Sequence, residues 1–174
     1  TNEIKISELS KIAKKNKIPL VVDAGSGCIT SFQKFNMPLE KITKEYLKSG
    51  ADIVMFSGDK LLGGPQSGII SGKKKYIDLI KQNTLYRTLR VDKLSLSLLE
   101  GILRTYKTES SFYNNNLALE LLTRNRDVLR SFGENILNDI SSKIIEFYNL
   151  KLINTMVEAG SGAMPVNSIE SIGI

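Results

Sequence analysis

Histidine is absent from the sequence, and cysteine occurs once, as Cys28. Without histidine, the chain cannot supply a histidine general base, a histidine-containing catalytic triad or the common zinc ligands, so we expect no metal site. Acid–base chemistry would fall to Lys, Asp, Glu or Tyr side chains. A single cysteine excludes an internal disulfide and fits a reducing compartment, which predicts a cytoplasmic protein.

Long apolar runs are also absent. No run approaches the roughly 18 residues that a membrane-spanning helix requires, and nothing marks the chain for export. We therefore expect no membrane partner. The first residues enter directly on a helical pattern and the last ones resemble the start of a strand, so we expect a fragment of a longer protein that lacks the N-terminal part.

The composition is that of a soluble globular protein, with 41% apolar and 24% charged residues. A length of 174 residues suffices for one domain, or for one domain and part of another. The formal net charge of +6 suits an anionic substrate or an RNA partner, and a surplus of surface lysine is the alternative explanation.

Strand-like and helical patterns alternate through about residue 90, which predicts an α/β fold with a parallel or mixed sheet. The expected strands are residues 18–22, 51–58, 67–72 and 150–160. The expected helices are residues 6–17 with Ser7 as N-cap, 38–50, 73–83, 92–107 with Asp92 as N-cap, and 117–148 with an interruption at Gly133. In the helix over 92–107, one apolar stripe comprises Leu96, Leu99, Leu103 and Tyr106.

The pattern changes after Lys107, where the sequence TESSFYNNN predicts a polar connector. We expect a domain boundary near residues 108–115, with helices and a strand after it.

One lysine lies between two expected strands, in the segment DIVMFSGDKLLGGPQSGIISG. Lys60 follows the end of the first strand, at the sheet edge where open α/β sheets bind their ligands. Burial lowers the pKa of a lysine, and a neutral amine is a nucleophile that forms a Schiff base with a carbonyl. The glycines after it let the backbone approach a bulky ligand. A solvated surface lysine beside a hairpin is the alternative.

A carboxylate follows another expected strand in the same way. Asp23 ends an apolar run and precedes AGSG, so two strands would deliver Asp23 and Lys60 to one sheet edge. Enzymes that use pyridoxal 5'-phosphate (PLP) need such a pair, a lysine for the covalent link and a carboxylate on the pyridine nitrogen. Taken alone, Asp23 could also be a helix N-cap or a turn residue. Together, the two residues favour PLP.

Three segments carry a more specific resemblance: VVDAGSG, FSGDKLLGGPQSGIISGKK and YRTLRVDKLSLSLLEGILRTY. Together they closely resemble the bacterial selenocysteine synthase family, the L-seryl-tRNA(Sec) selenium transferases, which are fold-type I PLP enzymes. The resemblance implies that residues 1–107 are the C-terminal half of the PLP-binding large domain, and that residues 108–174 comprise linker helices and the start of a small α+β C-terminal domain. It also implies a homo-oligomer in which neighbouring subunits complete one another's sites.

The resemblance implies roles for individual residues. Lys60 would be the Schiff-base lysine, Asp23 the partner of the pyridine nitrogen, and Ser57 a hydroxyl contact to the cofactor phosphate. Asp59 would assist proton transfer or orient Lys60, although it could equally be a turn residue.

Two arginines, Arg87 and Arg90, match a family pair suited to binding the selenium donor. Guanidinium groups bind phosphate-like anions bidentately, and in a helix a spacing of three would put both on one face. Ordinary surface arginines near a helix start are the alternative.

The reaction that the resemblance implies is the conversion of seryl-tRNA(Sec) to selenocysteinyl-tRNA(Sec) with selenophosphate, through a dehydroalanyl intermediate. One alternative is another fold-type I lyase that acts on a free amino acid, of the cystathionine-lyase or cysteine-desulfurase kind. The other is a non-catalytic tRNA-binding or oligomerisation fragment. We expect the fragment alone to be incomplete, because the phosphate loop and the ring-stacking residue would precede Thr1.

Overall fold

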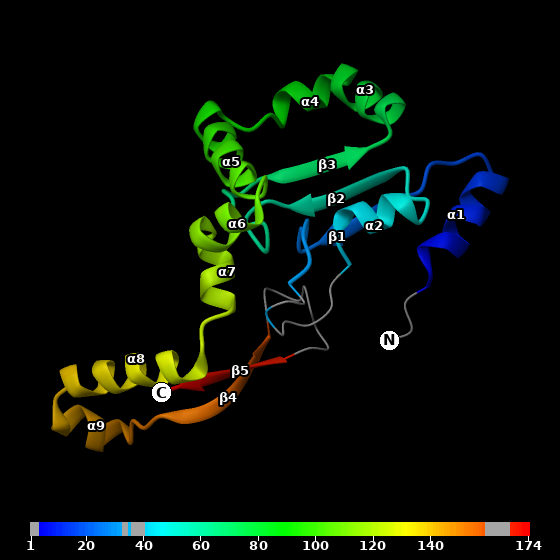
Figure 1. The fold of residues 1–174 in the computed structure, drawn as a ribbon. Helices are drawn as coiled ribbons and strands as arrows, with labels where there is room; N and C mark the ends of the chain where they lie inside the picture. The colour runs from blue at the N-terminus through cyan, green and yellow to red at the C-terminus, as the bar shows by residue number, and fades with distance from the viewer. Residues whose placement is uncertain (1–3, 33–34, 36–40, 159–167) are drawn as a thin grey trace.

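The computed structural model describes residues 4–32, 35, 41–158 and 168–174 (Figure 1). A three-stranded sheet occupies the first half of the chain. A series of helices then leads to a two-stranded sheet near the C-terminus. The α/β class predicted from the sequence is confirmed, with a mixed rather than an all-parallel sheet.

The three-stranded sheet consists of β1 (Val21–Gly25), β2 (Ile53–Ser57) and β3 (Gly68–Gly72), in that spatial order. Strands β1 and β2 are parallel, so their carboxyl ends meet at one edge of the sheet, whereas β3 returns antiparallel to β2. Strand β1 begins and ends three residues later than expected, so that Asp23 lies within the strand.

Two helices contribute side chains that pack on one face of this sheet, α1 (Ile6–Lys15) and α2 (Thr43–Lys48). The buried cluster between them centres on Ala51, Val54 and Phe56, and partly buried side chains from both helices and from β1 and β3 pack against it. Val54 is completely inaccessible to solvent. The burial of these apolar side chains fixes which face of each strand points toward α1 and α2.

The helices that follow the sheet are α3 (Lys74–Gln82), α4 (Thr84–Thr88), α5 (Lys93–Thr105), α6 (Glu109–Asn115), α7 (Leu117–Leu122), α8 (Arg126–Asp139) and α9 (Ser142–Tyr148). Five of them begin at a side chain that accepts a backbone N–H of the first turn, namely Asn83, Asp92, Thr108, Asn116 and Asn125. Such caps satisfy amide groups that a helix start leaves without partners, which allows the chain to restart helices at short intervals.

A second buried cluster holds this helical part against the sheet. It consists of Cys28, Phe32, Leu61, Phe112 and Leu119. These residues come from the loops after β1 and β2 and from α6 and α7. The segments that follow the two parallel strands are therefore packed on the helices that follow α5.

The chain ends in an antiparallel pair, β4 (Ile153–Glu158) and β5 (Ser168–Gly173), beside α8. The expected end of the strand at Gly160 lies outside the described residues. In the part of the chain that the structure describes, no helix is both long and apolar enough to cross a membrane.

Two expectations about the helical part are wrong. The polar connector after Lys107 forms α6, because Thr108 caps it and Phe112 is buried in the second cluster. Gly133 does not interrupt a helix but lies inside α8, and a Cβ there would come within 2.5 Å of the Leu152 side chain. This glycine serves close packing, and the helical stretch breaks instead at residues 123–125 and 140–141.

The expected N-cap of α1 is also wrong. Ser7 lies inside the helix, and Lys5 occupies the N-cap position without a side-chain cap. By contrast, Asp92 caps α5 as expected, with its Oδ1 accepting the Ser95 N–H at 2.9 Å. Of the helix expected over residues 38–50, the structure describes residues 41–50, of which Thr43–Lys48 form α2.

Candidate active site

The loops after β1 and β2 are joined directly at the carboxyl edge of the sheet. The Leu61 N–H donates to the Ser26 carbonyl oxygen at 3.1 Å. Gly27 packs against the end of β2 with a φ of +75°, and a Cβ there would lie 2.4 Å from the Ser57 carbonyl oxygen. The chain segments that carry Asp23 and Lys60 are therefore fixed to one another through their backbones.

Asp23 lies in β1 as the register partner of Met55 in β2. Side chains alternate along a strand, so Met55 and Ser57 share a face, and Asp23 lies on that same face. The Asp23 carboxylate is exposed, and its Oδ1 accepts the Gly25 N–H at 3.0 Å. This face is opposite the one that α1 and α2 cover.

Lys60 lies three residues beyond Ser57, in the loop after β2. Its side chain is half-buried, between the exposed Asp59 and the buried Leu61. The structure records no hydrogen bond or ion pair from the Lys60 ammonium to any of the residues that it describes. The amine is therefore available for a ligand, while its backbone neighbours are fixed.

The loop around Lys60 is closed by its own backbone hydrogen bonds. Gly58 N–H donates to Ser67 O at 2.8 Å, Gly64 N–H donates to Gly58 O at 2.8 Å, and Gly63 N–H donates to Lys60 O at 2.9 Å. Gly63 adopts a φ of +77°, which an L side chain rarely adopts. The glycine-rich sequence thus forms a compact turn and not an open hairpin.

Two residues that sequence patterns did not assign to the site support this loop, Tyr106 by a direct hydrogen bond and Asn116 through Tyr106. The Tyr106 hydroxyl donates to the Leu62 carbonyl oxygen at 2.9 Å, and Asn116 Nδ2 donates to the Tyr106 hydroxyl oxygen at 3.2 Å. Burial raises the pKa of Tyr106 to about 12. The available signal was the tyrosine at the end of an apolar stripe, because a buried phenol usually finds a hydrogen-bond partner.

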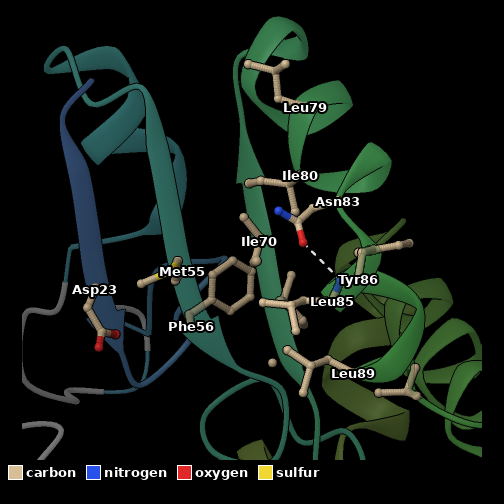
Figure 2. Close-up of a pocket in the computed structure, with 13 residues that line it drawn as sticks. Asp23, Met55, Phe56, Ile70, Leu79, Ile80, Asn83, Leu85, Tyr86 and Leu89 are labelled. Atoms are coloured by element: carbon tan, nitrogen blue, oxygen red, sulfur yellow. Dashed lines mark hydrogen bonds between the residues drawn. The ribbon is translucent and has the colours of Figure 1, made fainter. Parts of the chain in front are cut away.

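A pocket of about 760 Å³ opens on the face that carries Asp23 (Figure 2). Its other walls are mostly apolar and come from β2, β3, α3 and α4, including Met55, Ile70, Leu85 and Leu89. Asp23 contributes a carboxylate to this apolar wall. Lys60 does not line this pocket: Asp23 contributes to it from within β1, and Lys60 lies in the loop after the neighbouring strand β2.

The two arginines lie in the segment that runs from α4 to the start of α5. Arg87 is in the last turn of α4, and Arg90 lies beyond the C-cap residue Leu89, so the helix does not put both on one face. Both side chains are exposed. The residues of this segment that line the pocket are Leu85, Tyr86, Leu89 and Val91, and the arginines do not line it.

The fold and the site together define an α/β protein with a mixed sheet, in which one strand carries a carboxylate and the loop after the neighbouring parallel strand carries a lysine. Among the described residues, no group of three or more His, Cys, Asp or Glu side chains could hold a metal ion. The profile of one family, SelA: L-seryl-tRNA selenium transferase, matches residues 1–174. The chain belongs to this family, which confirms the resemblance found in the sequence.

Curated relatives carry the name L-seryl-tRNA(Sec) selenium transferase. The protein of Caldanaerobacter subterraneus subsp. tengcongensis is 42% identical over 100% of this chain and 37% of its own length. That of Clostridium botulinum (strain Loch Maree / Type A3) is 38% identical over 95% of this chain and 36% of its own length. The Proteus mirabilis protein is 35% identical over 100% of this chain and 38% of its own length. The chain thus spans little more than a third of the length of these relatives.

Among solved structures, D-glucosaminate-6-phosphate ammonia-lyase shares the fold, with a TM-score of 0.59 and 22% identity. The similarity covers 99% of this chain and 37% of that protein. At this identity the likeness shows the fold alone.

Proposed function

We propose that the full-length protein containing this chain converts seryl-tRNA(Sec) to selenocysteinyl-tRNA(Sec), with PLP as cofactor and selenophosphate as selenium donor. Family membership supports the overall reaction. The observation that carries the proposal is the Leu61–Ser26 hydrogen bond, which fixes the loop of Lys60 against the segment that follows Asp23 at the shared strand edge.

The residues at this edge fit PLP. The Lys60 ammonium forms no hydrogen bond or ion pair with the described residues and could hold the cofactor's aldehyde carbon covalently. Asp23 and Ser57 lie on one face, where they would bind the pyridine nitrogen and the phosphate respectively. When bound, PLP supplies an electron sink for charge that develops at the substrate Cα atom.

In this proposal Lys60 also moves a proton. The Lys60 amine would be the base that accepts the Cα proton of the seryl substrate. Asp59 would orient Lys60 or assist that transfer, because it is the preceding residue and its carboxylate is exposed. The serine hydroxyl group would then take up a proton and leave as water.

Arg87 and Arg90 would bind the selenium donor, because guanidinium groups suit phosphate-like anions. Both are exposed, and neither lines the pocket with Asp23. We therefore propose that they act in a site that a second subunit of a homo-oligomer completes.

The test uses the full-length protein with PLP, seryl-tRNA(Sec) and selenophosphate, and measures selenocysteinyl-tRNA(Sec). Lys60→Ala is expected to abolish the product. Lys107→Ala, an exposed lysine in the segment after α5, is the control and should behave as wild type. Replacing Arg87 and Arg90 together by alanine should raise the selenophosphate concentration needed for half-maximal rate while serine hydroxyl loss continues.

Three results would contradict the proposal. An active Lys60→Ala protein would show that Lys60 is not needed to hold the cofactor or to transfer the proton. Turnover of free serine or cysteine without tRNA would indicate a fold-type I lyase for free amino acids. Tight tRNA binding without cofactor attachment would indicate a non-catalytic tRNA-binding protein.

A further inference from the structure

The loop that carries Lys60 is held from two sides. On one side, the Leu61 N–H donates to the Ser26 carbonyl oxygen in the loop after β1. On the other side, the Tyr106 hydroxyl, at the end of α5, lies 2.9 Å from the Leu62 carbonyl oxygen and 3.4 Å from that of Leu61. Leu61 is therefore held through its amide group, and Leu62 is held through its carbonyl group.

The direction of these hydrogen bonds follows from the cap of α7. Asn116 is buried and caps α7, with its Oδ1 accepting the Leu119 N–H at 2.9 Å. That contact leaves the amide Nδ2 pointing to the Tyr106 hydroxyl oxygen, which accepts from it at 3.2 Å. The Tyr106 hydroxyl group must then donate its own hydrogen to the Leu62 carbonyl oxygen. Because burial raises the pKa of Tyr106 to about 12, the phenol keeps that proton throughout the neutral range.

The buried leucines restrict the loop only partly. Leu61 and Leu62 are 3% and 0% exposed, so their side chains stay in the protein interior. Burial of a side chain still allows the peptide plane to rotate, and rotation at residues 61–62 would redirect the side chain of the residue before them. The hydrogen bond from Tyr106 opposes that rotation.

We propose that Tyr106 and Asn116 are positioning residues for Lys60, because they fix the peptide planes that follow Leu61 and Leu62, and so limit how the segment that carries the lysine can turn. The inference rests on the proposed function, in which Lys60 carries the cofactor. Neither residue is assigned any direct contact with the cofactor or the substrate.

The test uses full-length protein loaded with PLP. The readouts are the visible circular dichroism band of the bound cofactor, which depends on its orientation, and the rate of cyanoborohydride trapping at Lys60. Tyr106→Phe removes one hydroxyl group and is expected to change the band and to slow trapping several-fold. Tyr148→Phe is the matched control, because Tyr148 is exposed in α9 and far along the chain.

A second variant separates positioning from folding. Asn116→Asp keeps the oxygen that caps α7 but has no amide hydrogens for Tyr106, and its carboxylate would draw the Tyr106 proton away from Leu62. It should change the circular dichroism band in the same way as Tyr106→Phe, and it carries the test if Tyr106→Phe fails to fold.

The possible results are distinguishable. A lowered melting temperature with a wild-type band and trapping rate in both variants would show a merely structural role and overturn the inference. If the wild-type protein does not attach the cofactor at Lys60, the proposed function fails and this inference fails with it. If the wild type attaches it there and the variants match the wild type, only the inference fails.

Discussion

At the residue scale, Lys60 combines an available amine with a fixed backbone. Its neighbours Leu61 and Leu62 are buried and hydrogen-bonded, while its own side chain has no partner among the described residues. Such an arrangement suits a covalent cofactor link, because the loop does not have to become ordered when the cofactor binds. An ordinary surface lysine would not need its following residues held from two directions.

Asp23 has a testable role of its own. In the full-length protein, Asp23→Asn should leave the cofactor attached to Lys60 but slow exchange of the substrate Cα hydrogen with solvent by about 100-fold or more, the scale of a lost acid–base or electrostatic contribution. Exchange into deuterated water with seryl-tRNA(Sec) measures this rate. Asp139→Asn, at the far end of α8, is the control, and a near-normal rate for the Asp23 variant would refute the proposed role.

At the scale of elements, the sequence determines strands and capped helices well, but it does not determine how the loops pack. The apolar runs identify β2 and β3, and Asp92 marks the start of α5, because hydrophobic periodicity and capping are local properties. The helix α6 depends on burial of Phe112 among residues from distant segments, which no local pattern contains.

Glycine shows the limit of local patterns most clearly. Gly133 indicates a helix break by its intrinsic propensity, yet it lies inside α8 because Leu152 needs the space that a side chain would fill. In the candidate site, too, local sequence predicts some features, and others depend on how distant segments pack. The apolar runs before Asp23 and Lys60 predict that neighbouring strands and their loops carry the two residues, whereas the contact of Tyr106 with the Lys60 loop depends on how α5 packs.

The contact between the loop after β1 and the end of β2 can be tested with a pair of glycine variants. Gly27→Ala should destabilise the protein by about 1–3 kcal/mol, because the residue is held at positive φ and its Cβ would overlap the Ser57 carbonyl oxygen. Gly101→Ala lies in α5 with no atom near the added methyl group, and should be neutral or stabilise by up to about 1 kcal/mol. Chemical denaturation of the full-length variants measures both, and equal stability of the two would contradict the packing described for Gly27.

At the scale of the whole molecule, the two faces of the three-stranded sheet differ. One face is covered by α1 and α2, whereas the other forms the mostly apolar pocket that contains Asp23. Several side chains of α3 and α4 near that pocket are exposed, including Leu79, Leu85 and Leu89.

Since the chain spans little more than a third of its relatives' length, activity must be measured on the full-length protein.

An ion pair near the start of β2 predicts how stability depends on pH. Asp52 accepts from Lys73 at 2.7 Å and from the Leu20 N–H at 2.8 Å, and these hydrogen bonds lower the pKa of Asp52 below its ordinary value of 3.8. A carboxylate with a lowered folded-state pKa stabilises the protein above its unfolded pKa, and that contribution is lost as the pH falls through the folded value.

Asp52→Asn should therefore lower the denaturation midpoint of the full-length protein at neutral pH, and the difference from wild type should shrink once the pH falls below 3.8. Asp78→Asn is the control. Asp78 pairs with Lys74 on the surface of α3, where such pairs contribute little. A difference between wild type and Asp52→Asn that does not change with pH would rule out the ion pair as its cause.

The most direct test of the proposed function is borohydride reduction of the full-length protein in the presence of PLP, followed by peptide mass mapping. The expected result is a pyridoxyl group on Lys60, which would identify this loop as the cofactor site and leave the tRNA substrate to be tested by turnover. A folded protein that carries the label on another lysine, or on none, would contradict the assignment of Lys60 and with it the proposed site.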